Sequence, residues 1–544
     1  MAEIPKTPWP IELNEHPFEE RYRQGKESNK ENQYRVPTTE EVEKMSKIEV
    51  AKECFSHPES YRNLILEHVA IKPKEAYDGG SVYYMWLNKV CPVGCEFCFF
   101  QSPAKCEGNP EDEITDEGIE KIIQITKDGQ MDKFVVSGGG EPIKAKNKVN
   151  NLARGVKTKN FVVVTSAYWS RGKNATDKIL SGLLENSSEN PYQPTTTIRV
   201  SLDECHFEKL SKDKGFQYVN NVIDWFADKA SDNPKFKLAF HTMEGDKTVE
   251  ELLAQLPVES REETNPGEAS QEANHRIKIK LKNNLSFDIE HTQTFLASPY
   301  VNLKDQEEQA RNQETFKKFI FSKRQGNMSV SHHGDKPNGV YYLTFYNGQT
   351  IIWGSTAPDT ETSIYNDDYR TIMDKNLKDV ATLGILEKGQ YHMQEIVSEI
   401  SPKTVERTIG VGLRDFYVRL LLEEDTTRLY ASVRLMQEYM AEGRISEEEQ
   451  AAWPAQLKVM VSLPQAELKE ACLESPKTII QQYLDDRTVS VDKLTALHTR
   501  IALGHYSVKP EDMYRAVREA NIAPEIKQGF LAANYPPQSN LDSF

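Results

Sequence analysis

The feature that most constrains this chain is a run of three cysteines, Cys91, Cys95 and Cys98, within eight residues. Three thiolates at this spacing are one ligand short of a closed four-ligand metal site. An iron–sulfur cluster held by three cysteines leaves one iron without a protein ligand, and an open metal position is where chemistry can take place. The run therefore predicts a reactive iron–sulfur cluster.

A zinc site is the alternative for these cysteines. Cys106 lies eight residues after Cys98, so the four thiols together would complete a Cys₄ zinc site. Zinc ligands usually come as two separate pairs, and this spacing does not. The cysteines also follow an apolar strand at 81–90 rather than a small loop-rich module. We favour the cluster, and the zinc site stays open as the alternative.

A second motif follows about forty residues later. The apolar segment 133–137 predicts a short buried strand, and it runs directly into Gly138, Gly139, Gly140, Glu141 and Pro142. Consecutive glycines after a strand indicate a tight turn, and this turn carries one carboxylate.

The two motifs together resemble those of the radical S-adenosylmethionine (SAM) enzymes. By this resemblance Cys91, Cys95 and Cys98 hold one [4Fe–4S] cluster, whose open iron binds the amino and carboxylate groups of SAM. The resemblance also implies SAM contacts from the aromatic residue before the third cysteine, from the glycine turn and from the ends of the third and fourth strands: Phe97, Gly138, Gly139, Gly140, Glu141, Ser166, Ser201 and Asp203. No catalytic side chain is assigned.

Other readings of some site residues remain open. Thr165 and Ser166, like Ser201 and Asp203, are also what ordinary strand ends contain, because Ser and Asp favour turns. Where family members often place a carboxylate-binding arginine, this chain offers Lys209, Lys212 and Lys214.

Three further positions carry weaker hypotheses. His241 ends the fifth predicted strand and either faces a substrate or is a hydrogen-bonded core histidine. Cys205 is either a hydrogen-atom donor or, as we favour, a buried thiol. The adjacent His332 and His333 are not expected to share a metal, because neighbouring side chains in a loop diverge.

Length and charge limit the remaining possibilities. A chain of 544 residues predicts about three or four domains. The net charge of −16 disfavours binding to nucleic acid. No apolar run of 18 residues and no leader segment stand out, so we expect no membrane span, no signal peptide and a cytoplasmic location. Seven cysteines in this length are no disulfide framework.

The order of predicted elements gives an α/β fold class. Strands alternating with helices imply a parallel sheet with right-handed crossovers, and by the resemblance a partial (β/α)6 radical SAM barrel, with the site at the carboxyl ends of its strands. We expect an N-terminal arm and capping helices (1–75), the barrel (76–300), a small α+β extension (301–400) and a C-terminal helical domain (401–544). The predicted strands are 82–90, 133–137, 161–166, 196–202, 236–243 and 275–281, and the predicted helices are 114–128, 172–186, 216–231 and 247–256.

The segments around and after the sixth strand carry their own predictions. Residues 257–274 are polar and predict a solvated loop. A helix near 304–325, a β-hairpin over 340–353 with an Asn-Gly turn, and a helix entered over 362–372 should follow. This order resembles the auxiliary-cluster extension of peptide-modifying radical SAM enzymes, but it has no cysteine, so we predict no second cluster.

The resemblance implies an enzyme that uses a 5′-deoxyadenosyl radical to modify a ribosomally made precursor peptide. Its expected partners are that peptide, an accessory protein that presents it, and an electron donor such as flavodoxin or ferredoxin. Two alternatives stay open. One is a radical SAM enzyme acting on a small molecule such as a nucleotide sugar, and the other is a non-enzymatic zinc scaffold.

Overall fold

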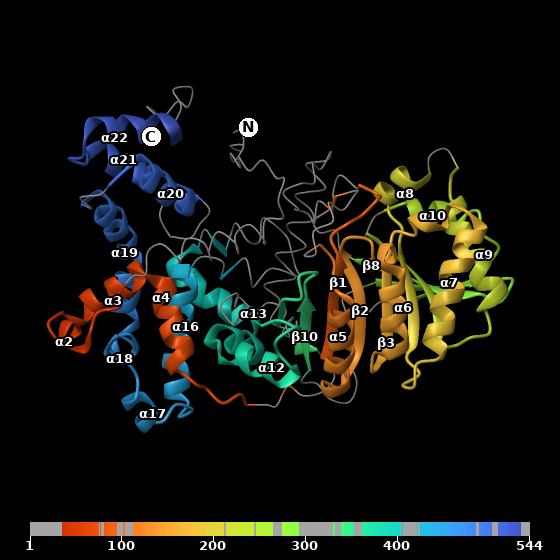
Figure 1. Ribbon diagram of the computed structural model, residues 1–544, viewed down its shortest axis with the longest axis horizontal. Coiled ribbons are helices and arrows are strands. Elements are labelled where there is room, and N and C mark those ends of the chain that lie inside the picture. The colour runs from red at the N-terminus through yellow and green to blue at the C-terminus, as the bar shows by residue number, and fades with distance from the viewer. Residues whose placement is uncertain are drawn as a thin grey trace.

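In the computed structural model the sheet with its helices and a second, wholly helical part lie side by side (Figure 1). Helices α12 (Tyr369–Lys378) and α13 (Val380–Ile400) lie between them. The structure describes residues 35–74, 77, 81–94, 102–103, 112–211, 214–243, 246–264, 275–292, 330–331, 339–352, 362–402, 404–405, 421–422, 425–485, 489–502 and 510–534.

One large, mostly parallel sheet organises the first part. Its strand order is β11-β10-β1-β2-β3-β4-β5-β8-β7-β6, with β9 paired to β10. The strands are β1 (Ser81–Asn88), β2 (Met131–Gly139), β3 (Thr158–Thr165), β4 (Thr195–Ser201), β5 (Phe236–Met243), β6 (Val258–Thr264), β7 (His275–Leu281), β8 (Ser286–Thr292), β9 (Val330–Ser331), β10 (Gly339–Thr344) and β11 (Thr350–Ile352). The chain therefore has an α/β fold.

Helices cover one face of this sheet because their apolar stripes match it. In α5, the Thr115 side chain caps the first turn by accepting a hydrogen bond from the Gly118 amide. Ile119, Ile122 and Ile125 then recur at helical spacing and are buried. The helices of this part are α5 (Asp116–Asp128), η2 (Pro142–Ala145), α6 (Lys146–Gly155), η3 (Tyr168–Arg171), α7 (Lys173–Ser188), α8 (Glu204–Ser211), α9 (Gln217–Lys229) and α10 (Thr248–Leu253).

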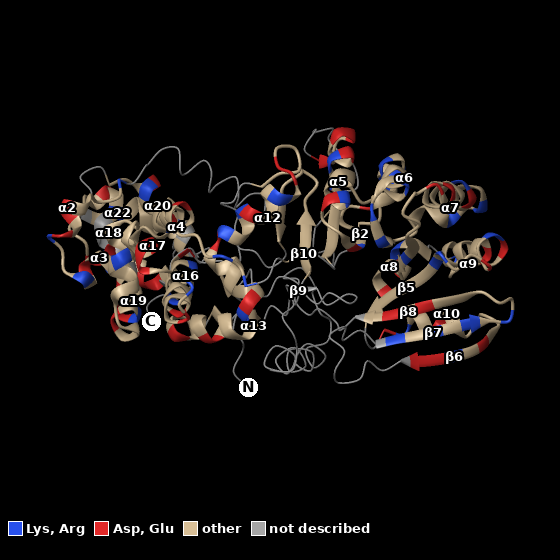
Figure 2. Cartoon of the chain, turned by 90° about the horizontal axis from the view of Figure 1, so that it is seen from below, with Lys and Arg blue, Asp and Glu red and all other residues tan. Residues whose placement is uncertain are grey.

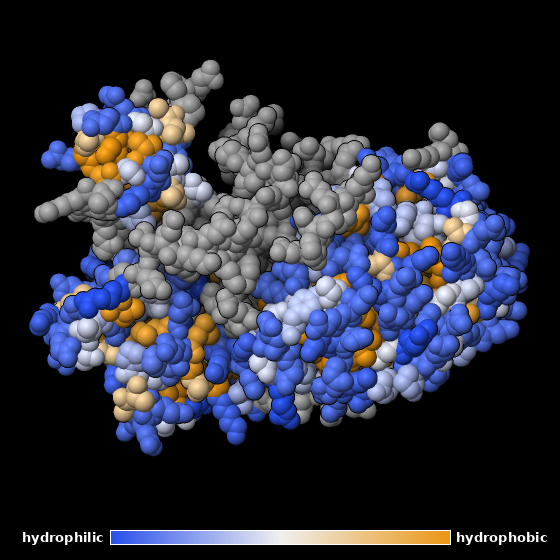
Figure 3. Space-filling model, viewed as in Figure 1, coloured by the Kyte–Doolittle hydropathy of each residue, from blue (hydrophilic) through white to orange (hydrophobic). Residues whose placement is uncertain are grey.

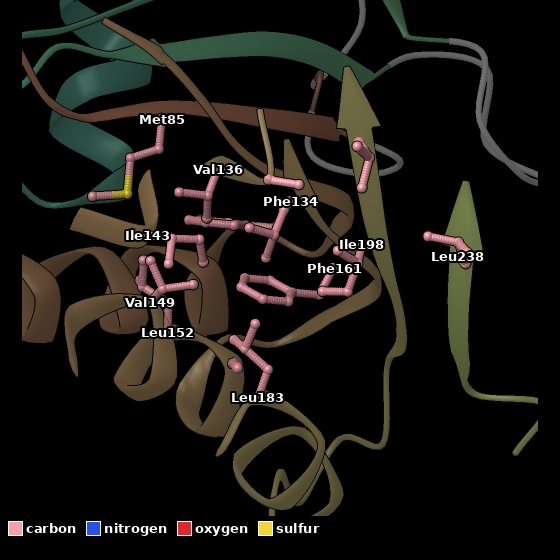
Figure 4. Close-up of a cluster of buried hydrophobic side chains, with 14 of the residues drawn as sticks. Met85, Phe134, Val136, Ile143, Val149, Leu152, Phe161, Leu183, Ile198 and Leu238 are labelled. Atoms are coloured by element: carbon pink, nitrogen blue, oxygen red, sulfur yellow. The ribbon is translucent and has the colours of Figure 1, made fainter. Parts of the chain in front are cut away.

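The sheet has two different faces. Phe134, Phe161 and Ile198 point from neighbouring strands toward the helices and form the buried core with Val149 and Leu152 of α6 (Figure 4). Successive side chains along a strand point to opposite sides. The residues between these core positions therefore form the other face, which we call the second face.

The order of the last strands differs from the sequence prediction. Residues 275–281 form β7, which is antiparallel to β8, and it is β8 that pairs in parallel with β5. Part of the predicted loop 257–274 is β6, paired to β7. Every second residue of these strands is charged or polar, so the sequence resembled a solvated loop. Figure 2 shows the charged residues along β6 to β8. The prediction also missed α6 and α8.

The predicted hairpin forms as β10 and β11, but it belongs to the same sheet. β10 pairs in parallel with β1, with Tyr341 opposite Val82. Helix α12 (Tyr369–Lys378) begins after the Asp368 cap, inside the range 362–372 over which the chain was predicted to enter a helix, and α13 (Val380–Ile400) follows. The predicted helix at 304–325 lies outside the described residues.

The helical part brings N-terminal and C-terminal helices into one core. Phe55 and Tyr61 from the N-terminal helices are buried in one apolar core with Tyr430, Leu468 and Cys472. The prediction that these N-terminal helices cap the sheet is therefore wrong. The helices are α2 (Thr39–Val42), α3 (Lys47–Ser56), α4 (Pro58–His68), α16 (Asp425–Ala441), α17 (Glu447–Ala451), α18 (Ala455–Ser462), α19 (Gln465–Asp485), α20 (Val491–Ala502), α21 (Pro510–Glu519) and α22 (Pro524–Asn534).

The outer surface over the helices that cover the sheet is largely hydrophilic (Figure 3). Within the described ranges, none of the helices combines the length and apolar character that crossing a membrane requires.

Candidate functional site

The end of β1 holds Cys91 next to a buried asparagine. Asn88 is buried, and its side-chain oxygen accepts a hydrogen bond from the Val90 amide at 3.0 Å. The Cys91 amide donates to the Pro103 carbonyl at 2.9 Å. Cys91 itself is partly exposed. These hydrogen bonds therefore fix the backbone of Cys91, the first cysteine of the motif, at the carboxyl end of a central strand.

The glycine turn packs directly against this strand end. Gly138 and Gly139 have φ of 51° and 71°, which L side chains rarely adopt. A Cβ on Gly140 would lie 2.3 Å from both the Asn88 side-chain oxygen and the Val90 carbonyl oxygen. The turn therefore requires glycines so that its backbone can approach β1.

Hydrogen bonds join the glycine turn to residues that precede and follow Cys91 in the chain. The Glu141 amide donates to the Val90 carbonyl at 2.8 Å, and the Asn88 side-chain amide donates to the Glu141 carbonyl at 3.1 Å. The Ser102 hydroxyl donates to the Gly139 carbonyl. Since Val90 directly precedes Cys91, the first cysteine and the turn form one hydrogen-bonded unit.

The Glu141 carboxylate is buried and accepts four hydrogen bonds. Oε1 accepts from the Ile143 amide at 3.2 Å and the Thr165 hydroxyl at 2.7 Å. Oε2 accepts from the Ser166 amide at 2.8 Å and the Ser166 hydroxyl at 2.6 Å. Burial raises the pKa of this carboxyl, and the hydrogen bonds from Ser166 and Thr165 oppose that rise. The side chain thus ties the turn to the end of β3.

The loop after β3 is built around the same carboxylate. The Trp169 indole N–H and the Ala167 amide both donate to the Thr165 hydroxyl oxygen at 3.0 Å. Burial, followed by the nearby charges of Glu141 and Cys91, raises the pKa of Tyr168 to about 12. Tyr168 is therefore a neutral phenol within electrostatic reach of both motifs.

At the end of β4 the two predicted residues have different surroundings. Ser201 is half-buried on the second face and lies opposite His241 of β5. Asp203 is buried and caps α8, because its Oδ1 accepts from the His206 amide at 2.9 Å. Its Oδ2 lies 2.6 Å from His206 Nδ1. Burial alone would raise the pKa of Asp203, but the charge and hydrogen bonds of His206 outweigh it and lower that pKa.

The structure brings most predicted site residues to neighbouring strand ends. Cys91 follows β1, the glycine turn ends β2, Ser166 follows β3 and Ser201 ends β4, in the order of the sheet. The predictions for Cys95, Phe97 and Cys98 lie outside the described residues, as do Cys106 and the pair His332 and His333.

Sequence reasoning missed three residues that shape this site. Asn88 joins β1 to the turn, Tyr168 lies near Cys91 and Glu141, and His206 engages Asp203. An asparagine closing an otherwise apolar strand was the available signal for Asn88, and an Asp followed three residues later by His was the signal for the cap. Nothing in the sequence singles out Tyr168.

One family comparison covers this region. Residues 78–184, from just before β1 into α7, match the family described as a 4Fe-4S single cluster domain. A 4Fe–4S cluster domain is thus detected where the cysteine run and the glycine turn lie, although the match spans less than half of the chain. No curated protein matches the chain. In the described part of the chain, no group of three or more His, Cys, Asp or Glu side chains is arranged to hold a metal.

Proposed function

We propose that this protein is a radical SAM enzyme built on a partial (β/α)6 barrel. The observation that carries the proposal is the hydrogen-bonded unit of Cys91 and the glycine turn, linked through the Val90 carbonyl and the Glu141 amide. The cluster-domain match over residues 78–184 supports the same reading.

Cys91, Cys95 and Cys98 would hold one [4Fe–4S] cluster. Thiolates are the ligands that such clusters take, and the partial exposure of Cys91 suits a ligand at the surface of a site. When bound, the cluster and SAM together supply reductive cleavage of SAM and hydrogen abstraction from the substrate. The chain supplies binding, orientation and exclusion of water.

Glu141 acts in this proposal as a positioning residue. A carboxylate offers about four acceptor positions, and protein donors engage all four in Glu141. We therefore assign the amino group of SAM to the backbone of the turn, Gly138 to Gly140, rather than to the Glu141 side chain. Ser201 and Phe97 remain proposed SAM contacts.

Ser166 and Asp203 are reassigned for the same reason. The Ser166 hydroxyl donates to Glu141, and the Asp203 oxygens engage His206. We assign both residues to holding the strand ends in place beside the cofactor.

The substrate and partners are finer proposals. We propose a ribosomally made precursor peptide, presented by an accessory protein, and an electron donor such as flavodoxin or ferredoxin, all in the cytoplasm. A nucleotide sugar is the alternative substrate class. The motif resemblance carries these proposals.

The test is anaerobic reconstitution of the full chain with iron and sulfide. We expect about four irons per chain and a brown protein with absorbance near roughly 400 nm. Addition of SAM and a strong reductant should then yield 5′-deoxyadenosine. Cys91→Ala should lose the cluster and this product, because each thiolate is an iron ligand.

Cys106→Ala is the matched control and should keep both. Loss of metal in Cys106→Ala as complete as in Cys95→Ala would instead establish a four-thiolate site. Zinc without iron in the purified chain, with no cluster after reconstitution, would contradict the proposal.

A further inference from the structure

A polar cluster lies on the second face of the sheet, away from the cysteine motif. It consists of Arg199 on β4, His241 on β5, Glu290 on β8 and Arg276 on β7. His241 lies opposite Glu290, and Glu290 lies opposite Arg276, so three neighbouring strands contribute one row. Arg199 is two residues before Ser201, which heads the same row on β4.

Two arginines hold the one carboxylate of this cluster. Arg199 Nη1 donates to Glu290 Oε2 at 3.2 Å, and Arg276 Nη2 lies 3.5 Å from Glu290 Oε1. Burial alone would raise the pKa of Glu290, but Arg199, Arg276 and Lys133 outweigh it and lower that pKa. Three cationic side chains therefore act on the Glu290 carboxylate.

His241 adds no charge to the polar cluster near pH 7. Burial, and then the neighbouring Arg199, lower its pKa to about 3, so its imidazole is neutral near pH 7. The nearby Lys278 and Asp288 lie opposite each other across β7 and β8 and balance. Arg199, Arg276 and Lys133, set against the carboxylates of Glu290 and Asp203, leave a local excess of positive charge on a chain whose net charge is −16.

Arg199 also has a donor to spare. Its Nε is buried and, among the described residues, has no hydrogen-bond partner. A buried, unmatched donor on a charged side chain is unusual in folded proteins. Guanidinium groups bind carboxylate and phosphate oxygens through paired N–H donors, and Nε takes part in such pairs.

We propose that the polar cluster binds an anionic group of the substrate, a carboxylate or a phosphate, through Arg199. The proposal rests on the proposed function and narrows its substrate class. Ser201, the proposed SAM contact, lies opposite His241 of this cluster. A substrate anchored at Arg199 would therefore lie beside the cofactor. An acidic peptide would supply a carboxylate, and a nucleotide sugar would supply phosphates.

Binding of two simple anions to the reconstituted, SAM-loaded chain tests the proposal. The probes are glutarate, for the carboxylate source, and uridine diphosphate, for the phosphate source, titrated at low ionic strength by calorimetry. We expect the wild type to bind one of them, and the preferred probe identifies the source. Arg199→Gln should weaken that binding by about tenfold or more, the loss typical of a hydrogen-bonded charge pair, while Arg199→Lys should retain part of it.

Arg261→Gln is the matched control. Arg261 of β6 pairs with Glu250 of α10 at 2.9 Å, and the residue opposite Arg261 on β7, Ile279, belongs to the buried core rather than the second face. This variant should bind the probe as the wild type does. Glu290→Gln removes the one negative charge of the cluster and should tighten binding, an effect of opposite sign that a merely damaged fold would not produce.

The outcomes separate this proposal from the proposed function. Failure of the wild type to bind either probe, or unchanged binding in Arg199→Gln, overturns the polar cluster as an anion site. Loss of SAM affinity in Arg199→Gln with probe binding unchanged also overturns it and places Arg199 in the SAM site. Absence of a cluster overturns the proposed function alone, because probe binding to the cluster-free chain is still measured.

Discussion

The two halves of the second face differ sharply in character. On β1, β2 and β3 its centre is apolar, although Lys133 lies near the start of β2: Val82, Val135 and Val162 pack together, and the rings of Tyr84 and Tyr341 stack with centroids 6.1 Å apart. On β4, β5, β8 and β7 it carries the charges of the polar cluster. Both halves belong to one continuous sheet.

The two halves also differ in whether the chain leaves a buried polar group unmatched. At the ends of β1 to β3, the polar groups of Asn88 and Glu141 are engaged by the chain's own donors and acceptors. In the other half, Arg199 retains a buried donor and positive charge is in excess. In the function we propose, the first half fixes the cofactor and the second receives the anionic group of the substrate.

The largest expected effect comes from placing a charge in the apolar half. Val162→Lys should lower the free energy of unfolding by about 3–5 kcal/mol, because an ammonium would be buried without a partner. Val162 is 6% exposed. Thr197 lies directly opposite it on β4 and is half-buried in the polar half.

Thr197→Lys is the matched control and should change stability by less than about 1 kcal/mol. Denaturant titration of both variants measures the difference. Equal losses at the two positions would mean that the halves do not differ in the way described.

A smaller effect is expected from filling the glycine turn. Gly140→Ala should cost about 1–3 kcal/mol, the usual range for overpacking, because the new methyl group overlaps Asn88 and Val90. It should also reduce iron content after reconstitution by displacing Cys91. Gly182→Ala in α7, where the nearest neighbour is Asn150 at 3.4 Å, should be neutral or stabilising by up to about 1 kcal/mol. Full iron content in Gly140→Ala would mean that the glycine turn does not position Cys91 for cluster binding.

The smallest effect is a difference in pH dependence between the two buried carboxylates. The pKa of Glu290 is lowered, because its cationic neighbours outweigh burial, so its contribution to stability is present above its ordinary pKa near 4.5 and is lost as pH falls. The pKa of Glu141 is raised by burial, so its contribution is present below 4.5 and is lost as pH rises through the folded value.

Glu290→Gln and Glu141→Gln remove these contributions. Each should cost about 1–3 kcal/mol through the altered hydrogen bonds. Between pH 7 and pH 4 the deficit relative to wild type should shrink for Glu290→Gln and grow for Glu141→Gln. The measurement is the unfolding midpoint of each variant and of the wild type across that pH range. If the two deficits changed with pH in the same direction, the pKa shifts assigned to Glu290 and Glu141 would be contradicted.

How much the sequence predicts depends on how local the signal is. The glycine turn was predicted because a strand followed by consecutive glycines is a local pattern. The pairing of β8 with β5, and of β10 with β1, was not, because register between distant strands leaves no local pattern. The engagement of Glu141 by Thr165 and Ser166 joins residues 24 and 25 positions apart, and only the fold shows it.

The shared core of the two chain ends has a consequence for synthesis. Helix α3 packs against α19, more than 400 residues later in the chain, and the sheet with the cysteine motif lies between them in sequence. As the protein leaves the ribosome, α3 and α4 can pack against each other, but their partners in α16, α18 and α19 emerge much later. The sheet can form first, because its strands are closer in sequence and domains generally fold as units during synthesis. The helical part then forms late, when the N-terminal helices α3 and α4 can pack with α16, α18 and α19.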